Sequence, residues 1–213
     1  MHPLAAVVLL ALPALCAAQP EAPVAKPEVK AGDRWTYRRM NYERNQAQDT
    51  YEVHVTFAAR DAIHAVITEK DGRESDATYT SEWNEVVSPR GRVNVRDKGE
   101  LQFPLRTGAT YVIEWTLEEP RRQMVSGRHK RNVRVVGWEE VMVPAGRFRA
   151  LKVQSEGHFW PFGSGYVGTV RDVFWYVPEV KRWVKHVHDS FRPGNRISIT
   201  EHSGEELVEF RIQ

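Results

Sequence analysis

His186 and His188 are the first residues in this sequence whose type and spacing suggest chemistry. In a β-strand, residues two apart project to the same face, so the two imidazoles would lie side by side. Neutral imidazole is a common zinc ligand, and Asp189 or His202 could supply a further ligand. No third ligand has a distinctive spacing, so a solvated sheet face is the favoured interpretation of this pair.

A run of basic residues is the second candidate, because it has no acidic residue between Arg121 and Arg134. Within it, Arg128, Arg131 and Arg134 are placed to meet an anionic lipid headgroup or another polyanion. A solvated hairpin arm is the alternative interpretation. The whole chain has 30 basic and 28 acidic residues, and this balance does not indicate a nucleic-acid-binding protein.

Aromatic residues form the third group, and several of them lie in strand-like patterns. Tyr111, Trp115 and Trp175 each have a clear face in an alternating segment, and Trp160 lies in an aromatic segment predicted to be a loop. We expect some of these residues to line an apolar groove, with the segment 128–134 at its rim. The alternative is that all these rings pack together in a closed core.

Other motifs for catalysis are absent from the sequence. Residues 163–168 have the glycine spacing of a dinucleotide-binding fingerprint, but a strand pattern follows where that motif needs a helix. We interpret them as a loop leading into a glycine-rich strand. Ser164 lacks the spacing of a nucleophile elbow, and no paired carboxylates or phosphate loop stand out. The sequence predicts neither a catalytic residue nor a cofactor.

The elements that would position these groups are strands. Residues 51–57 alternate apolar and polar side chains, residues 111–117 do the same, and residues 208–212 end the chain in the same pattern. No stretch of ten or more residues has a convincing 3.6-residue period. We therefore predict an all-β domain over residues 32–213, an antiparallel sheet curled into a half-barrel or barrel, with two related half-sheets as an alternative organisation.

The clearest local prediction is a hairpin at Pro144-Ala145-Gly146. Proline presets the first turn dihedral, and Gly146 can adopt the positive φ that closes a three-residue loop. Such a loop pairs Val143 with Arg147 and Met142 with Phe148.

Residues 1–18 are interpreted as a secretory signal peptide. The apolar run from Leu4 to Leu15 is too short to span a bilayer as a helix, and small residues precede the expected mature start at Gln19. Lipidation of Cys16 is the less favoured alternative, because the bulky Leu15 precedes it. The proline-rich residues 19–31 should be an extended linker without packed structure. No later segment is long and apolar enough to be a transmembrane helix.

Three segments together resemble a class of bacterial exported proteins of unknown function. They are residues 32–37 (Gly-Asp-Arg-Trp-Thr-Tyr), residues 143–153 (Val-Pro-Ala-Gly-Arg-Phe-Arg-Ala-Leu-Lys-Val) and residues 175–185 (Trp-Tyr-Val-Pro-Glu-Val-Lys-Arg-Trp-Val-Lys). The resemblance implies a sheet curled into a half-barrel, similar to the periplasmic lipoprotein-localisation factors, whose concave face holds acyl chains. None of the shared residues is a known catalytic group.

These observations lead to three functional hypotheses. The first is a non-catalytic periplasmic or secreted domain that binds an apolar or amphipathic ligand, such as a lipid, or an envelope partner. The second is a metal-assisted hydrolase that uses His186 and His188. The third is a purely structural envelope protein.

Overall fold

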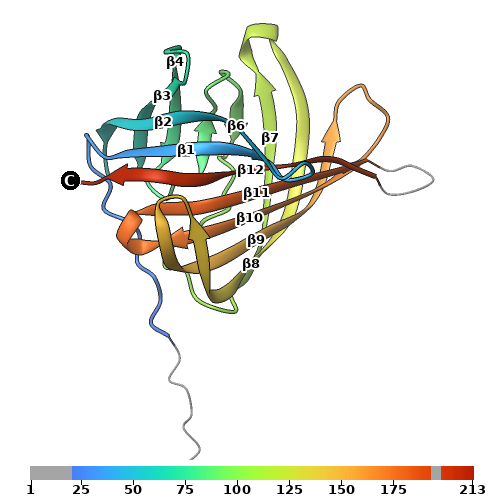
Figure 1. Ribbon diagram of the computed structural model, residues 1–213. Helices are drawn as coiled ribbons and strands as arrows, with labels where there is room; N and C mark the ends of the chain where they lie inside the picture. Colours follow the sequence, from blue (N-terminus) through green and yellow to red (C-terminus); the bar gives the residue numbers. More distant parts are fainter. Residues whose placement is uncertain (1–20, 193–197) are drawn as a thin grey trace, which may run out of the picture.

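The protein is a single closed antiparallel β-barrel of twelve strands (Figure 1). The computed structural model describes residues 21–192 and 198–213. The strands are β1 (Arg34–Asn41), β2 (Gln46–Ala58), β3 (Ala62–Glu69), β4 (Glu74–Thr80), β5 (Glu85–Val87), β6 (Val93–Val95), β7 (Thr110–Glu119), β8 (Met124–Val143), β9 (Gly146–Pro161), β10 (Gly168–Val177), β11 (Arg182–Arg192) and β12 (Ser198–Arg211). Two short 3₁₀ turns, η1 (Pro120–Arg122) and η2 (Pro178–Val180), precede β8 and β11.

Each strand pairs with its neighbours in sequence, and β1 closes the barrel by pairing with both β2 and β12. The predicted all-β class is confirmed, and of the two predicted forms, half-barrel and barrel, the closed one is present. Closure removes the exposed edges that an open sheet would present to other chains. No helix in the described part of the chain has the length and apolarity needed to cross a bilayer.

The alternation of apolar and polar residues decides which side chains enter the barrel. Trp35 and Tyr37 of β1, Val53 and Val55 of β2 and Leu207 of β12 are all fully buried. Their polar neighbours in sequence face outward, as the alternation predicts. Trp35 donates a 2.9 Å hydrogen bond from its indole to the carbonyl of Val180, which ties η2 to the buried face of β1.

Asp33 holds the chain together at this same end. Its buried carboxylate accepts hydrogen bonds from the backbone amides of Lys30, at 2.9 Å, and Gln213, at 2.7 Å. The Lys181 ammonium lies 3.1 Å from the same group. The first and third of the segments that carry the family resemblance therefore meet in space.

The hairpin between β8 and β9 is present, but its loop is shorter than predicted. Val143 pairs with Gly146 and Met142 with Arg147, so the loop has two residues and the predicted pairing is wrong by one position. Gly146 has a φ of 135°, a positive value that disfavours other residues.

The aromatic segment 159–162 is not the loop that was predicted. Phe159 and Trp160 lie in β9, and only residues 162–167 connect β9 to β10. A Cβ atom on Gly168 would lie 2.0 Å from the Phe159 ring, so this glycine lets the ring cross β10. A strand follows the glycine-rich loop, as the sequence predicts, and a phosphate-binding helix is therefore not formed there.

The proline-rich segment before the barrel packs against it, which corrects part of the linker prediction. Val24 is buried and forms a two-way backbone bridge with Leu105, with both N···O distances at 2.9 Å. The predicted signal peptide, including Cys16 and the cleavage site before Gln19, lies outside the described residues.

Candidate functional site

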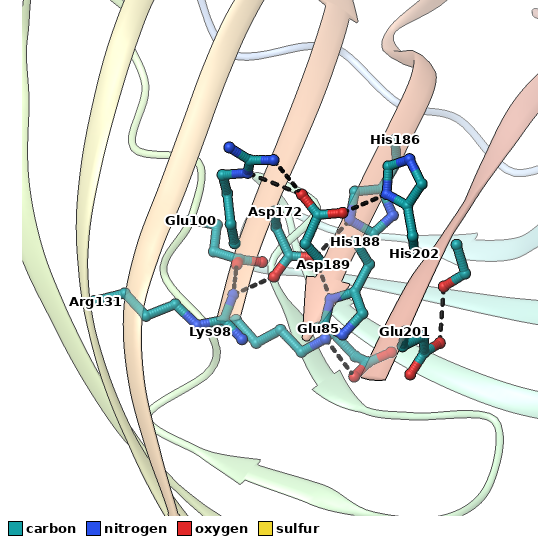
Figure 2. A network of polar contacts seen from close by, with 12 residues as sticks. Glu85, Lys98, Glu100, Arg131, Asp172, His186, His188, Asp189, Glu201 and His202 are labelled. Atoms are coloured by element: carbon teal, nitrogen blue, oxygen red, sulfur yellow. Dashed lines mark hydrogen bonds and ion pairs between the residues drawn. The ribbon is translucent and has the colours of Figure 1, made fainter. Parts of the chain in front are cut away.

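A buried ionic network occupies the barrel interior and is centred on Arg131 of β8. Alternation along β8 turns Arg131 inward together with Val133 and Val135. Its Nη1 lies 2.8 Å from Glu100 Oε1 and also bonds Asp172 of β10, and all three side chains are less than a tenth exposed (Figure 2). One arginine therefore bridges two carboxylates that are distant in sequence.

The two carboxylates respond differently to the same arginine. Burial raises the pKa of Glu100, and the attraction of Arg131 is insufficient to reverse this. At Asp172 burial also opposes ionisation, but Arg131 and hydrogen bonds from His186 and His188 hold its pKa well below the usual range. Asp172 is thus the fixed negative charge of the network.

His186 and His188 of β11 project to one face, as predicted, but that face is the barrel interior and not a solvated surface. His186 Nε2 and His188 Nδ1 lie 2.7 and 2.8 Å from the same oxygen, Asp172 Oδ1. His186 also stacks on Phe174, with ring centroids 4.4 Å apart. Burial alone would lower the pKa of His188, but Asp172 outweighs it and raises this pKa.

The further metal ligands considered from the sequence do not join this pair. Asp189 projects away from the network and bonds His202 and Arg171, at 2.5 Å from the arginine Nη2 (Figure 2). Within residues 21–192 and 198–213, no group of three or more His, Cys, Asp or Glu side chains is arranged to hold a metal ion.

An aromatic stack borders the network on the side of β7 and β8. Trp115 and His129 lie parallel with centroids 4.5 Å apart, and the Arg131 guanidinium carbon is 4.8 Å from the Trp115 ring centroid. Burial, followed by repulsion from Arg131 and Lys98, lowers the pKa of His129 to about 3. His129 is therefore neutral at physiological pH and acts as a polar aromatic ring beside a cation.

Two cavities open beside this network. The small cavity, of about 240 Å³, has a wall of aromatic rings, namely Tyr51, Tyr79, Trp83, Phe174 and Trp183. The large cavity, of about 1140 Å³, is lined mostly by charged and polar residues, including exposed ones such as Arg73 and Glu74. The cavities share the lining residues Arg39, Glu85, Pro89 and Lys98, so the small cavity adjoins the large one.

Three of the residues predicted to bind a ligand face the interior. Trp115 and Arg131 line the large cavity. Tyr111 points inward too, but its hydroxyl donates a 2.8 Å hydrogen bond to the carbonyl of Glu100 and its ring packs against the core.

The other four predicted residues lie on the outer face, away from both cavities. Arg128 pairs with Trp160 across β8 and β9, with the guanidinium carbon 5.7 Å from the ring centroid. The Trp175 indole donates a 2.6 Å hydrogen bond to Glu139, and Arg134 is exposed. The predicted arrangement, with residues 128–134 at the rim of one groove, is wrong because alternation sends Arg128 and Arg134 outward and Arg131 inward.

Sequence reasoning missed several residues that line the cavities, among them Arg182, Lys98, Glu100 and His129. For His129 the signal was present, since it shares the inward face of β8 with Arg131. Lys98 and Glu100 lie in a segment between β6 and β7 that has no regular period, so no sequence pattern places them inside.

Comparison with known proteins identifies the fold alone. No protein-family model matches the chain, and no curated protein matches its sequence. A solved structure of a protein described as a candidate lipoprotein from Parabacteroides distasonis is 14% identical, with a TM-score of 0.54 over 90% of this chain and 100% of that one. A second, a candidate exported protein with YmcC-like fold from Bacteroides fragilis, is also 14% identical, with a TM-score of 0.43 over 89% of this chain and 100% of that one.

Proposed function

We propose that this protein is an exported, non-catalytic domain that binds a small amphipathic ligand inside the barrel. The observation that carries the proposal is the pair of adjoining cavities. The small one has an aromatic wall as well as charged side chains, and the large one is lined mostly by charged and polar groups. Binding sites for small molecules combine apolar walls with a few polar groups that fix orientation. The apolar part of an amphipathic ligand would contact the aromatic wall, and its polar part would contact the charged and polar groups.

The internal ion pairs support a binding role over a purely structural one. Replacing buried ion pairs by apolar residues is often neutral or stabilising, so stability alone does not call for them. Here Arg131, Glu100 and Asp172 are instead held in place by one another and by two histidines. Such a network gives the cavity walls fixed charges.

The arrangement offers little support for hydrolysis. His186 and His188 both direct a nitrogen to Asp172, so their ring geometry is committed to that carboxylate. Hydrolysis of the kind first considered would need a further metal ligand or a nucleophile beside the two histidines.

The proposal of export rests on the predicted signal peptide, residues 1–18, which would direct the domain to the periplasm or outside the cell.

The test is the small-molecule content of the purified protein. The full chain is expressed with its own leader, purified from the periplasm without detergent, and extracted with organic solvent for mass spectrometry. We expect an amphipathic compound in stoichiometric amount.

Two matched variants serve as controls. Ile67→Phe adds volume to the wall of the small cavity, and Val112→Phe adds the same ring on the outer face, where Val112 is 59% exposed. The compound should be depleted from folded Ile67→Phe protein only. An extract without any such compound, together with no binding of added amphiphiles, would overturn the proposal.

A further inference from the structure

Arg182 is a buried cation in an aromatic cage beside the small cavity. It begins β11, one residue after Lys181 has ended η2, and is only 2% exposed. Its guanidinium carbon lies 4.3 Å from the Trp183 ring centroid, 4.5 Å from that of Trp83 and 5.3 Å from that of Tyr37. Trp35 and Tyr79 complete the cage at 5.7 Å each.

The cage stabilises the charge of Arg182 but leaves its donors without acceptors. Its Nε and Nη1 are buried, and no group among the described residues accepts a hydrogen bond from them. Ring faces attract a cation through their quadrupole, whereas guanidinium N–H groups are strong donors that need an acceptor near their plane. Buried donors of a charged group that lack acceptors cost free energy, so this side chain has room for a hydrogen-bond acceptor from a ligand.

The acids that line the small cavity are already occupied by other donors. Glu205 accepts hydrogen bonds from Tyr51 and from the Trp183 indole, the latter at 2.6 Å. Glu85 accepts from Asn94 at 3.1 Å and pairs with Lys98 at 3.2 Å.

Glu100 and Asp172, the other two acids of this wall, are held by the Arg131 network. The Arg39 guanidinium, also part of the wall, bonds Asp49 and Glu69. Among the charged side chains that line the small cavity, Arg182 is therefore the one with unmet hydrogen-bonding capacity in the described part of the chain.

We propose that Arg182 receives the carboxylate of a ligand whose apolar part lies against the aromatic wall of the small cavity. A carboxylate matches the fork of guanidinium donors and can accept hydrogen bonds from two of them at once. The rings of Trp83, Phe174 and Trp183 provide the apolar surface. This inference rests on the proposed function and deepens it, since it specifies the ligand as a small aryl or alkyl carboxylate.

The volumes define how such a ligand would lie. About 240 Å³ accommodates a carboxylate with a single ring or a short chain, and any polar extension would reach the adjoining large cavity. A ligand carboxylate beside Arg182 would supply the acceptor that its Nε and Nη1 lack among the described residues.

The test is calorimetric titration of the whole protein with 3-phenylpropanoate and with 3-phenylpropan-1-ol, which has the same ring and chain but no charge. Wild-type protein should bind the acid about 10- to 100-fold more tightly than the alcohol, as expected for charge-assisted hydrogen bonds. Arg182→Lys keeps the charge but loses the fork, and should weaken acid binding at least about tenfold. Arg128→Lys, on the outer face, should leave it unchanged.

A second measurement needs only the wild-type chain and covers the case in which Arg182→Lys does not fold. The assigned Nε–Hε signal of Arg182 in nitrogen-15 NMR should shift when the acid is added and not when the alcohol is added. Equal binding of acid and alcohol with a static Arg182 signal would overturn the role of Arg182 while leaving the binding function standing. Failure of both compounds to bind, together with an empty solvent extract, would overturn the proposed function as well.

Discussion

Replacing Arg131 by Met removes the only cation that bridges Glu100 and Asp172 in the described part of the chain, and should strongly destabilise the barrel. Methionine keeps most of the side-chain volume, so the change tests charge and not packing. Both carboxylates are less than a tenth exposed and would remain buried without their guanidinium. Breaking a buried ion pair by removing one partner costs about 3–5 kcal/mol, because the other charge is left uncompensated.

The matched control is Arg128→Met, three positions earlier on the same strand. Arg128 faces outward and pairs at 2.6 Å with Glu114, with side chains that are 51% and 45% exposed. An exposed pair of this kind contributes about 0–1 kcal/mol. Urea unfolding at pH 7 should therefore separate the two variants by several kcal/mol in the free energy of unfolding.

The pH dependence of this difference gives a second check. The folded pKa of Asp172 lies below its unfolded value, so its contribution to stability is present above the unfolded pKa and is lost as the pH falls through the folded pKa. Without Arg131, both carboxyl groups would take up protons at higher pH and become neutral. The deficit of Arg131→Met should thus shrink between pH 7 and about pH 4. Equal stability of Arg131→Met and Arg128→Met at pH 7 would refute the buried network.

Three further predictions concern the turn, the buried histidine and the leader. Gly146→Val should lower the free energy of unfolding by roughly 1–3 kcal/mol, because φ is 135° there, whereas Met142→Val on the same hairpin should change it little; equal urea midpoints would contradict this. The pKa of His129 falls from 6.5 to about 3 on folding, so the unfolded chain takes up a proton at this residue before the folded chain does. The free energy of unfolding should therefore decline from about pH 6.5 towards pH 3, and His129→Phe should flatten that decline in pH-dependent melts. The intact mass of the exported protein should correspond to a chain that begins at Gln19; an acylated Cys16 would revive the lipoprotein interpretation.

The fold could be predicted because alternation is a local property. Each strand shows its buried face in a few consecutive residues, and this predicts the all-β class. Closure into a barrel of twelve strands rests on the pairing of β1 with β12, which no local pattern reports. The hairpin at Pro144 was also visible, but whether its loop has two or three residues depends on the twist of the flanking strands, which no local pattern reports.

The site was only partly predictable, for reasons of distance and register. Arg131 and Asp172 are 41 positions apart, and only barrel closure tells which acid meets which base. The pairing of β10 with β11 also shifts register between Trp175 and Tyr176, which leaves Val184 unpaired and breaks the simple alternation two positions after Arg182. A residue that a period-two pattern cannot orient thus became the centre of the aromatic cage.

Fluorine NMR of protein labelled with 5-fluorotryptophan, titrated with 3-phenylpropanoate, tests the binding site in the barrel interior most directly. The chain has seven tryptophans, of which Trp83 and Trp183 line the small cavity, while Trp160 and Trp175 lie on the outer face. Binding inside the barrel predicts that the resonances of Trp83 and Trp183 shift with the titration while those of Trp160 and Trp175 remain in place. Shifts confined to Trp160 and Trp175, or no shift at any tryptophan, would contradict a binding site in the barrel interior.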